Sequence, residues 1–271
     1  MSKRLKWSGF WRVVGIVAAL VFCLLPIVWT LVAAPGLQPD GLRLQGKFTL
    51  DNLTGITTFE PAFVSEFAYT LAVSLAATAL TIGAAFPAAF WLARTSSPGV
   101  AALMPTLLVL AVSPLIAYGL PLSNVEHAAG LYGSFAGLVL ASAAVQLPLA
   151  VWLLRGYLLR IPRSLDEAAV LDGASGLTVL LRVVLPVALG GVIATGVLVF
   201  VLDWNLYLLP TLLISHPPEV LPVAMRDFFA FERDLEWPSA AAALIIAVAP
   251  AFLVVFIAQN ALENLVFDPE G

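Results

Sequence analysis

Hydrophobic residues fill long blocks of this 271-residue chain, and polar residues collect in the stretches between the blocks. A helix needs about 20 apolar residues to cross a hydrocarbon layer of ~30 Å. The blocks that reach this length lie at approximately 13–34, 67–93, 100–120, 133–154, 187–210 and 239–259. Because backbone polar groups in lipid must be satisfied within their own segment, each block predicts a helix. The pattern therefore predicts an all-α polytopic membrane protein with six spans in a single domain, 1–271.

The composition excludes a soluble domain. Hydrophobic residues make up 61% of the chain and charged residues only 11%, whereas a soluble domain is about 25% charged. The single cysteine, Cys23, allows no disulfide within the chain. The first block follows three basic residues, as a signal peptide does, but it is longer than the roughly 7–15 apolar residues of a signal sequence. We therefore expect it to be retained as the first span.

Lysine and arginine predict the orientation, because they concentrate on the cytoplasmic side of membrane proteins. With the N-terminus inside, the inner segments hold Lys3, Arg4, Lys6, Arg12, Arg94, Arg155, Arg160, Arg163 and Arg182. The outer segments then hold only Arg43, Lys47, Arg226 and Arg233. Six spans return the C-terminus to the cytoplasm. Acidic residues dominate the outer loops, and the loop at 211–238 is either a docking site for a binding protein or a lid or interfacial helix.

Small residues recur four apart in the second block, at Ala72/Ala76, Ala79/Gly83 and Ala84/Ala88. Such pairs allow two helices to approach closely. Packing within the chain and contact with a second membrane subunit both explain them.

The stretch "RSLDEAAVLDGASG" at 163–176 is polar although it lies between two apolar blocks. Ser164 and Glu167 have the spacing of a capping box, and Gly173 stands where a left-handed residue ends a helix. The pattern predicts a helix of about two turns at roughly 165–172. Ser175 is positioned to cap a second helix that ends at Pro186, where the next span begins. By itself this insert, about 156–186, is equally consistent with a plain connector between two spans.

The insert resembles the EAA loop of ABC importer permeases. The family pattern E-A-A-x3-G-x9-I-x-L-P is matched by Glu167-Ala168-Ala169, Gly173 and Val183-x-Leu185-Pro186, with valine in place of isoleucine. "PLSNVEHAAGLYGS" (121–134) and "DWNLYLLPTLL" (203–213) are similar to stretches of carbohydrate permeases of the maltose/trehalose type. The resemblance extends from about residue 13 to 262.

This resemblance implies the fold of a type I ABC importer permease in a bacterial or archaeal inner membrane. The short helix would be a coupling helix seated in a separate cytoplasmic ATPase, which would use ATP and Mg. The coupling residues would be Ser164, Glu167, Ala168, Ala169, Asp172, Gly173, Leu185 and Pro186. The implied partners are a second permease subunit, an ATPase dimer, an extracytoplasmic binding protein and a sugar. The chain has no G-x-x-x-x-G-K-[ST] phosphate loop, so we expect no enzyme activity of its own.

A second polar group lies in or near the fifth span. Asp203 at a helix centre costs about 2.5–3.5 kcal/mol on insertion scales, so such residues usually face protein or a water-filled cavity. Trp204, Asn205 and Tyr207 add aromatic faces and hydrogen-bonding groups that suit a sugar. Carbohydrate permeases have an acidic residue after Trp-Asn, where this chain has Leu206. The four residues either line the substrate pathway or bond and pack against neighbouring helices.

Other functions have less support from the sequence. His127 and His216 are the only histidines and have no partner at metal-ligand spacing, so we predict no metal site. An ABC permease for a non-sugar solute remains an alternative. A secondary transporter driven by ions is weaker, because such proteins usually need several ionisable groups inside the membrane.

Overall fold

The computed structural model describes residues 2–40, 43–56, 61–214, 216, 218–226 and 237–266. Much of the predicted outer loop at 211–238 and the acidic C-terminal end lie outside these residues. The chain divides into two compact units, residues 1–64 with 225–249, and residues 65–224 with 250–271. The expectation of a single domain, 1–271, stays a prediction.

The first unit contains α1 (Ser2–Ala33), a hairpin of β1 (Gln38–Asp40) and β2 (Arg43–Gln45), α2 (Asp51–Thr54) and the start of α13 (Trp237–Val266). The antiparallel hairpin is a small addition to the predicted all-α class. A cluster of buried alanines, Ala33, Ala34, Ala241 and Ala242, joins the end of α1 to α13.

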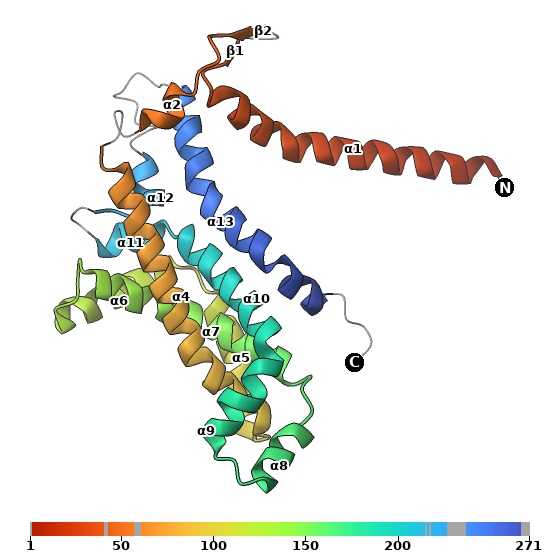
Figure 1. The fold of residues 1–271 in the computed structure, drawn as a ribbon, viewed down its shortest axis with the longest axis vertical. Coiled ribbons are helices and arrows are strands. Elements are labelled where there is room, and N and C mark those ends of the chain that lie inside the picture. Colours follow the sequence, from red (N-terminus) through yellow and green to blue (C-terminus); the bar gives the residue numbers. More distant parts are fainter. Residues whose placement is uncertain are drawn as a thin grey trace. The chain divides into compact units, whose positions relative to one another are not determined.

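The second unit carries the insert (Figure 1). Its long helices are α4 (Phe63–Arg94), α7 (Phe135–Leu158) and α10 (Leu185–Trp204). Shorter helices are α5 (Pro98–Val112), α6 (Ile116–Ala129), α8 (Ser164–Leu171), α9 (Gly176–Thr178), α11 (Leu208–Leu213) and α12 (Leu221–Ala224). A π-helical segment, η1 (Val179–Val184), joins α9 to α10. In Figure 1, α8 and α9 lie at one end of this unit, and α11 and α12 lie toward the other.

The core of the second unit is built from small residues of α4 against larger ones of α7 and α10. Ala85 and Ala89 are fully buried with Leu154, Leu158 and Val199. Of the small residues spaced four apart in the sequence, Ala79, Gly83, Ala84 and Ala88 are exposed, so they do not serve the first of the two alternatives, packing within the chain. Packing within the chain therefore uses a different face of α4.

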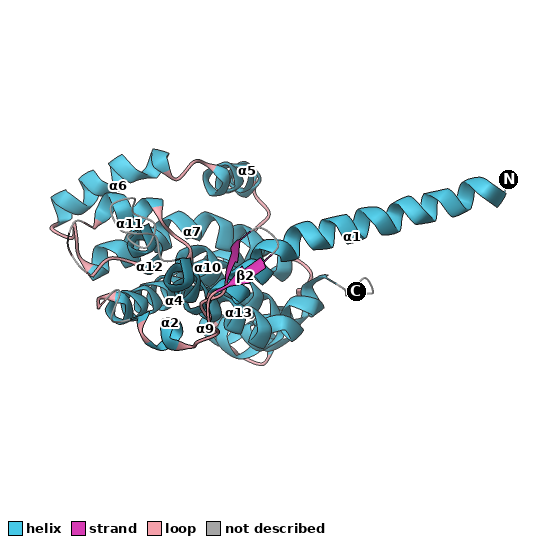
Figure 2. Cartoon of the chain, turned by 90° about the horizontal axis from the view of Figure 1, so that it is seen from above, coloured by secondary structure: helices cyan, strands magenta, loops and turns pink. Residues whose placement is uncertain are grey.

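Four of the membrane-spanning helices follow the predicted blocks closely, whereas the fifth, predicted at 187–210, ends at Trp204 and the third is broken. Among the described residues the candidate spans are Trp11–Ala33, Phe63–Arg94, Phe135–Leu158, Gly176–Trp204 and Trp237–Gln259. A sixth exists only if the pair α5 and α6 counts as one span, because these helices meet at 95°. Figure 2 shows α5 nearly end-on while α6 lies across the view.

The prediction of one continuous helix at 100–120 is therefore wrong. The break falls at Ser113, whose ψ of 143° is extended, directly before Pro114. A proline disfavours the helical conformation of the residue before it and supplies no N–H of its own.

Candidate coupling and substrate sites

Helix α8 ends as the sequence predicts. Gly173 has a φ of +84°, a left-handed conformation that side chains disfavour. Its N–H donates to the carbonyl of Val170 at 3.0 Å, and the N–H of Ala174 donates to that of Ala169 at 2.9 Å. These two bonds form a Schellman motif, which satisfies carbonyls that a helix end otherwise leaves open. The C-terminus of α8 is therefore capped by hydrogen bonds, which prevents fraying.

The predicted capping box is wrong. Ser164 is the first residue of α8, and Arg163 takes the N-cap position without a side-chain cap. The amide of Glu167 donates to the carbonyl of Arg163 at 3.1 Å, so it does not bond to the Ser164 hydroxyl. The helical turn begins one residue earlier than expected because Pro162 and Arg163 already direct the chain into it.

The second half of the insert is continuous with the following span. Ser175 caps α9 as predicted, since its hydroxyl accepts from the amide of Thr178. However, no break occurs at Leu185 and Pro186, because Pro186 sits in the first turn of α10 directly after η1. Proline is tolerated in a first helical turn, and here the π-helical turn takes up the change in hydrogen bonding.

Most of the predicted coupling residues are accessible on α8. Ser164, Glu167, Ala168, Asp172 and Gly173 are exposed, whereas Ala169 is half-buried against the core of the unit. The most exposed apolar side chain on this helix is Leu171, with 88% of its surface accessible. Leu165 and Val170 on the same helix are also exposed, by 39% and 58%, so α8 presents a small apolar patch of the kind that marks contact with another protein.

Arg94 at the end of α4 holds α8 in place. Its Nε and Nη2 atoms donate to the two carboxylate oxygens of Asp166 at 2.5 and 3.3 Å. Its Nη1 atom donates to the carbonyls of Leu158 and Ile161, each at 3.2 Å. In the sequence, Arg94 contributed only to the prediction of which loops are cytoplasmic. The contact joins residues 72 positions apart, so no local pattern could reveal it.

The predicted substrate residues separate into two groups. Asp203 is buried, with 5% of its surface exposed, and accepts a hydrogen bond from Gln146 of α7 at 3.4 Å. Trp204 is also buried and makes ring contacts with Phe67 and Phe200. These two residues therefore pack and bond inside the unit, which was one of the two alternatives from the sequence.

Asn205 and Tyr207 are exposed and line a cavity of about 600 Å³, here the Asn205 cavity. Gln146, Ser113 and Tyr118 also line it, so its wall includes the break between α5 and α6. Irregular backbone at membrane depth is tolerated where it lines a cavity. Sequence reasoning missed Gln146 and Tyr118, and Pro114 was the one signal that pointed to this break.

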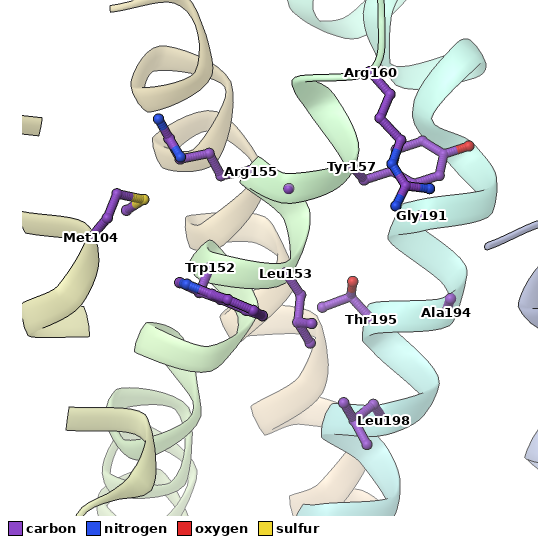
Figure 3. Close-up of a pocket in the computed structure, with 11 residues that line it drawn as sticks. Met104, Trp152, Leu153, Arg155, Tyr157, Arg160, Gly191, Ala194, Thr195 and Leu198 are labelled. Carbon is purple, nitrogen blue, oxygen red and sulfur yellow. The ribbon is translucent and has the colours of Figure 1, made fainter. Parts of the chain in front are cut away.

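A second cavity of about 570 Å³ lies farther along α7 and α10 (Figure 3). Trp152, Tyr157 and Arg160 line it from α7 and the turn after it, and Gly191 and Thr195 line it from α10. Gln146, Leu149, Leu153 and Gly156 fall on one face of α7, just as Gly191, Thr195, Leu198 and Leu202 fall on one face of α10. The two cavities therefore follow a shared face of this helix pair.

Metal chemistry has no support in the part of the chain that the structure describes. Within it, no group of three His, Cys, Asp or Glu side chains is arranged to hold a metal ion.

Comparison with known proteins settles the family. The profile of the "Binding-protein-dependent transport system inner membrane component" family matches residues 85–268. The chain belongs to this family. This permease is also 30% identical to the trehalose transport system permease protein SugB of Mycobacterium tuberculosis, over 93% of each chain. It is 27% identical to the probable ABC transporter permease protein y4oR of Sinorhizobium fredii, over 96% of this chain and 92% of that protein.

A solved structure supports the fold. A chain of a bacterial ABC transporter involved in the import of alginate superposes on the permease with a TM-score of 0.79. The alignment covers 96% of the permease and 98% of that chain at 17% sequence identity. The family match and the relative SugB confirm the resemblance to ABC importer permeases, and the protein is a multi-pass inner-membrane component.

Proposed function

We propose that this chain is the transmembrane permease subunit of an ATP-driven sugar importer, and that it forms half of the translocation pathway. Its relatives include transport proteins named for trehalose, for trehalose/maltose and for sulfoquinovosyl glycerol. Asn205 and Tyr207 in the Asn205 cavity supply the amide and aromatic groups that suit a sugar. Solute would be bound in this cavity and released by alternating access.

In this proposal α8 is the coupling helix that docks into a separate ATPase. The observation that carries it is Leu171, 88% exposed at the end of a helix closed by Gly173. A helix that does not fray transmits a displacement instead of absorbing it. ATP and Mg would be used by the ATPase, and both termini would lie in the cytoplasm with α8.

The assembly would contain a second permease subunit, two ATPase subunits and an extracytoplasmic binding protein. One solved relative is the alginate transporter in complex with a periplasmic protein that carries an alginate pentasaccharide. The exposed small residues of α4, Ala79/Gly83 and Ala84/Ala88, suit close contact with the second permease, since they are not used inside this chain.

Site-specific photo-crosslinking tests the docking of α8. A photoreactive amino acid at Leu171 should crosslink to the ATPase, whereas the same group at Leu120, exposed on α6, should not. Crosslinking from neither position, in a complex that still contains the ATPase, would contradict the proposal.

Uncoupling variants test the same step by activity. Glu167→Ala removes an exposed side chain, and Gly173→Leu forces a side chain into a left-handed residue at a cost of about 1–2 kcal/mol. Both variants should remain folded and inserted but hydrolyse ATP without transport. Wild-type transport in both would count against α8 as the coupling element.

An ABC importer for a non-sugar solute is the second candidate. One relative is an osmoprotective compounds uptake permease of Synechocystis, 30% identical over 70% of this chain. Binding assays with the extracytoplasmic binding protein and a panel of disaccharides and polyols separate the two.

A further inference from the structure

The ion pair between α4 and α8 has the geometry of a rigid joint. Arg94 is the last residue of α4, and Asp166 lies in the first turn of α8. Two parallel N–H donors of one guanidinium meet both oxygens of one carboxylate, at 2.5 and 3.3 Å. The two side chains are only 15% and 16% exposed, so water screens the pair far less than it screens a surface salt bridge.

The same guanidinium is tied to a third element. It donates to the carbonyls of Leu158 and Ile161, at and just after the C-terminus of α7, and it lies 5.6 Å above the ring of Phe90. The carbonyl of Leu158 also accepts from the N–H of Ile161 at 3.3 Å, so the arginine adds a second bond at a helix end where carbonyls lack partners within their own helix. Breaking the pair would leave a carboxylate and a guanidinium partly buried without each other.

We propose that Arg94 is a positioning residue for ATP-driven transport, which makes α4 follow the movement of α8. This inference rests on the proposed role of α8 as the coupling helix. Without the pair, α8 is joined to the bundle by its two chain connections, by the packing of Ala169 and Ala174 against a core that α4, α7 and α10 share, and by one hydrogen bond from Arg163 to the carbonyl of Ala93 of α4 at 3.3 Å. That bond is single and comes from an exposed arginine. The Arg94–Asp166 pair adds a shielded link with two hydrogen bonds to α4, whose exposed small residues are proposed to face the second permease.

Two distances report the movement in the complete complex with its ATPase. With Cys23 replaced by serine, spin labels at Leu165 and Leu189 follow α8 relative to α10. Labels at Trp91 and Leu189 follow α4 relative to α10. All three positions are exposed, so labelling should leave the core unchanged. In the parent protein, both distances should shift when Mg-ATP and vanadate are added.

Variants separate the joint from the docking step. Arg94→Ala and Asp166→Asn should abolish the α4 shift and keep the α8 shift, whereas Asp166→Glu, which retains the carboxylate, should keep both. Arg182→Ala is the matched control, because it removes another exposed arginine from the same insert. Elution of each variant with the ATPase confirms that it has folded, and Asp166→Asn keeps the shape of the side chain if Arg94→Ala fails this criterion.

The outcomes are distinct. An α4 shift that survives Asp166→Asn, or that never occurs in the parent, overturns the role of Arg94 and leaves docking intact. An α8 that never shifts, together with no crosslink from Leu171, overturns the proposed function and the joint with it.

Discussion

At the α8 end of the second unit, the guanidinium of Arg94 makes four hydrogen bonds to two different elements. At the Asn205 end of the same helices, one oxygen of Asp203 is buried without a hydrogen-bond partner among the described residues. Ser142 of α7 and Ser74 of α4 likewise have buried hydroxyls for which the described residues offer no partner. Both ends contain paired polar groups, but among the described residues buried side-chain atoms without a partner occur at the Asn205 end and not at the α8 end.

This difference indicates two mechanical roles. Buried polar groups that are fully paired hold their elements in one arrangement, whereas unpaired ones are costly unless water or a ligand completes them. The α8 end is therefore suited to transmit a displacement. The Asn205 end is suited to admit water and solute, and to change its hydrogen bonds as they pass.

The largest effect should come from Leu171, since the α8 end is useful only if its partner binds. Leu171→Asp should prevent the ATPase from co-purifying, because a carboxylate would be buried in the docking surface. The fold should be unaffected, as exposed substitutions change stability by only about 0.5 kcal/mol. Leu171→Met, which stays apolar, is the control. Normal co-purification of Leu171→Asp would place the docking surface elsewhere.

Gly191 tests the rigidity of the packing near α8. A Cβ atom there would lie 2.5 Å from the ring of Tyr157, so Gly191→Ala must displace a packed side chain. The expected loss is about 1–3 kcal/mol of unfolding free energy, measured as reduced thermal stability in detergent. Gly196→Ala on the same helix places its Cβ 3.8 Å from the side chain of Ile82 and should not reduce stability. In a Tyr157→Ala background the ring is absent, so Gly191→Ala should cause no further loss of stability. A further loss there would contradict a local clash.

Cysteine labelling distinguishes the wall of the Asn205 cavity from its interior. In a Cys23→Ser background, Asn205→Cys should react with a membrane-impermeant thiol reagent in at least one nucleotide state, since Asn205 is exposed. Asp203→Cys should react far more slowly, because only 5% of that residue is exposed. Equal rates would remove the distinction between the two positions.

The smallest effect is expected at Gln146. Gln146→Leu removes the one donor that the structure assigns to the Asp203 side chain, at a cost of about 1 kcal/mol. If a water molecule already donates hydrogen bonds to the Asp203 carboxylate, the loss of unfolding free energy will be smaller still. Asp203→Asn will then be tolerated equally well. A loss well above this value would show that the Asn205 end is as tightly paired as the α8 end. Thermal unfolding of the two variants provides the measurement.

Local signals predicted the parts of the molecule that depend on local chemistry. Gly173 ends α8 and Ser175 caps α9 because a left-handed residue and an N-cap hydroxyl act within one turn. The same reasoning failed at Ser164, where Pro162 and Arg163 start the helix earlier, and at Pro114, where one apolar block became two helices.

Features that depend on tertiary packing could not be read from the sequence. Trp204 and Asn205 are adjacent, yet one packs inward and the other lines a cavity, because the neighbours of α10 decide which face is covered. The pairing of Arg94 with Asp166 likewise needs the whole bundle to bring the two helix ends together.

The direction in which α8 projects depends on the number of residues in the π-helical segment Val179–Val184. Consecutive residues of an α-helix are about 100° apart around its axis. Loss of one residue from this turn would restore ordinary α-helical winding and swing everything before it by a comparable angle. Leu171 would then point in a new direction, although every residue of α8 would be unchanged. The number of residues between Gly173 and Pro186 is thus itself a determinant of what α8 can touch.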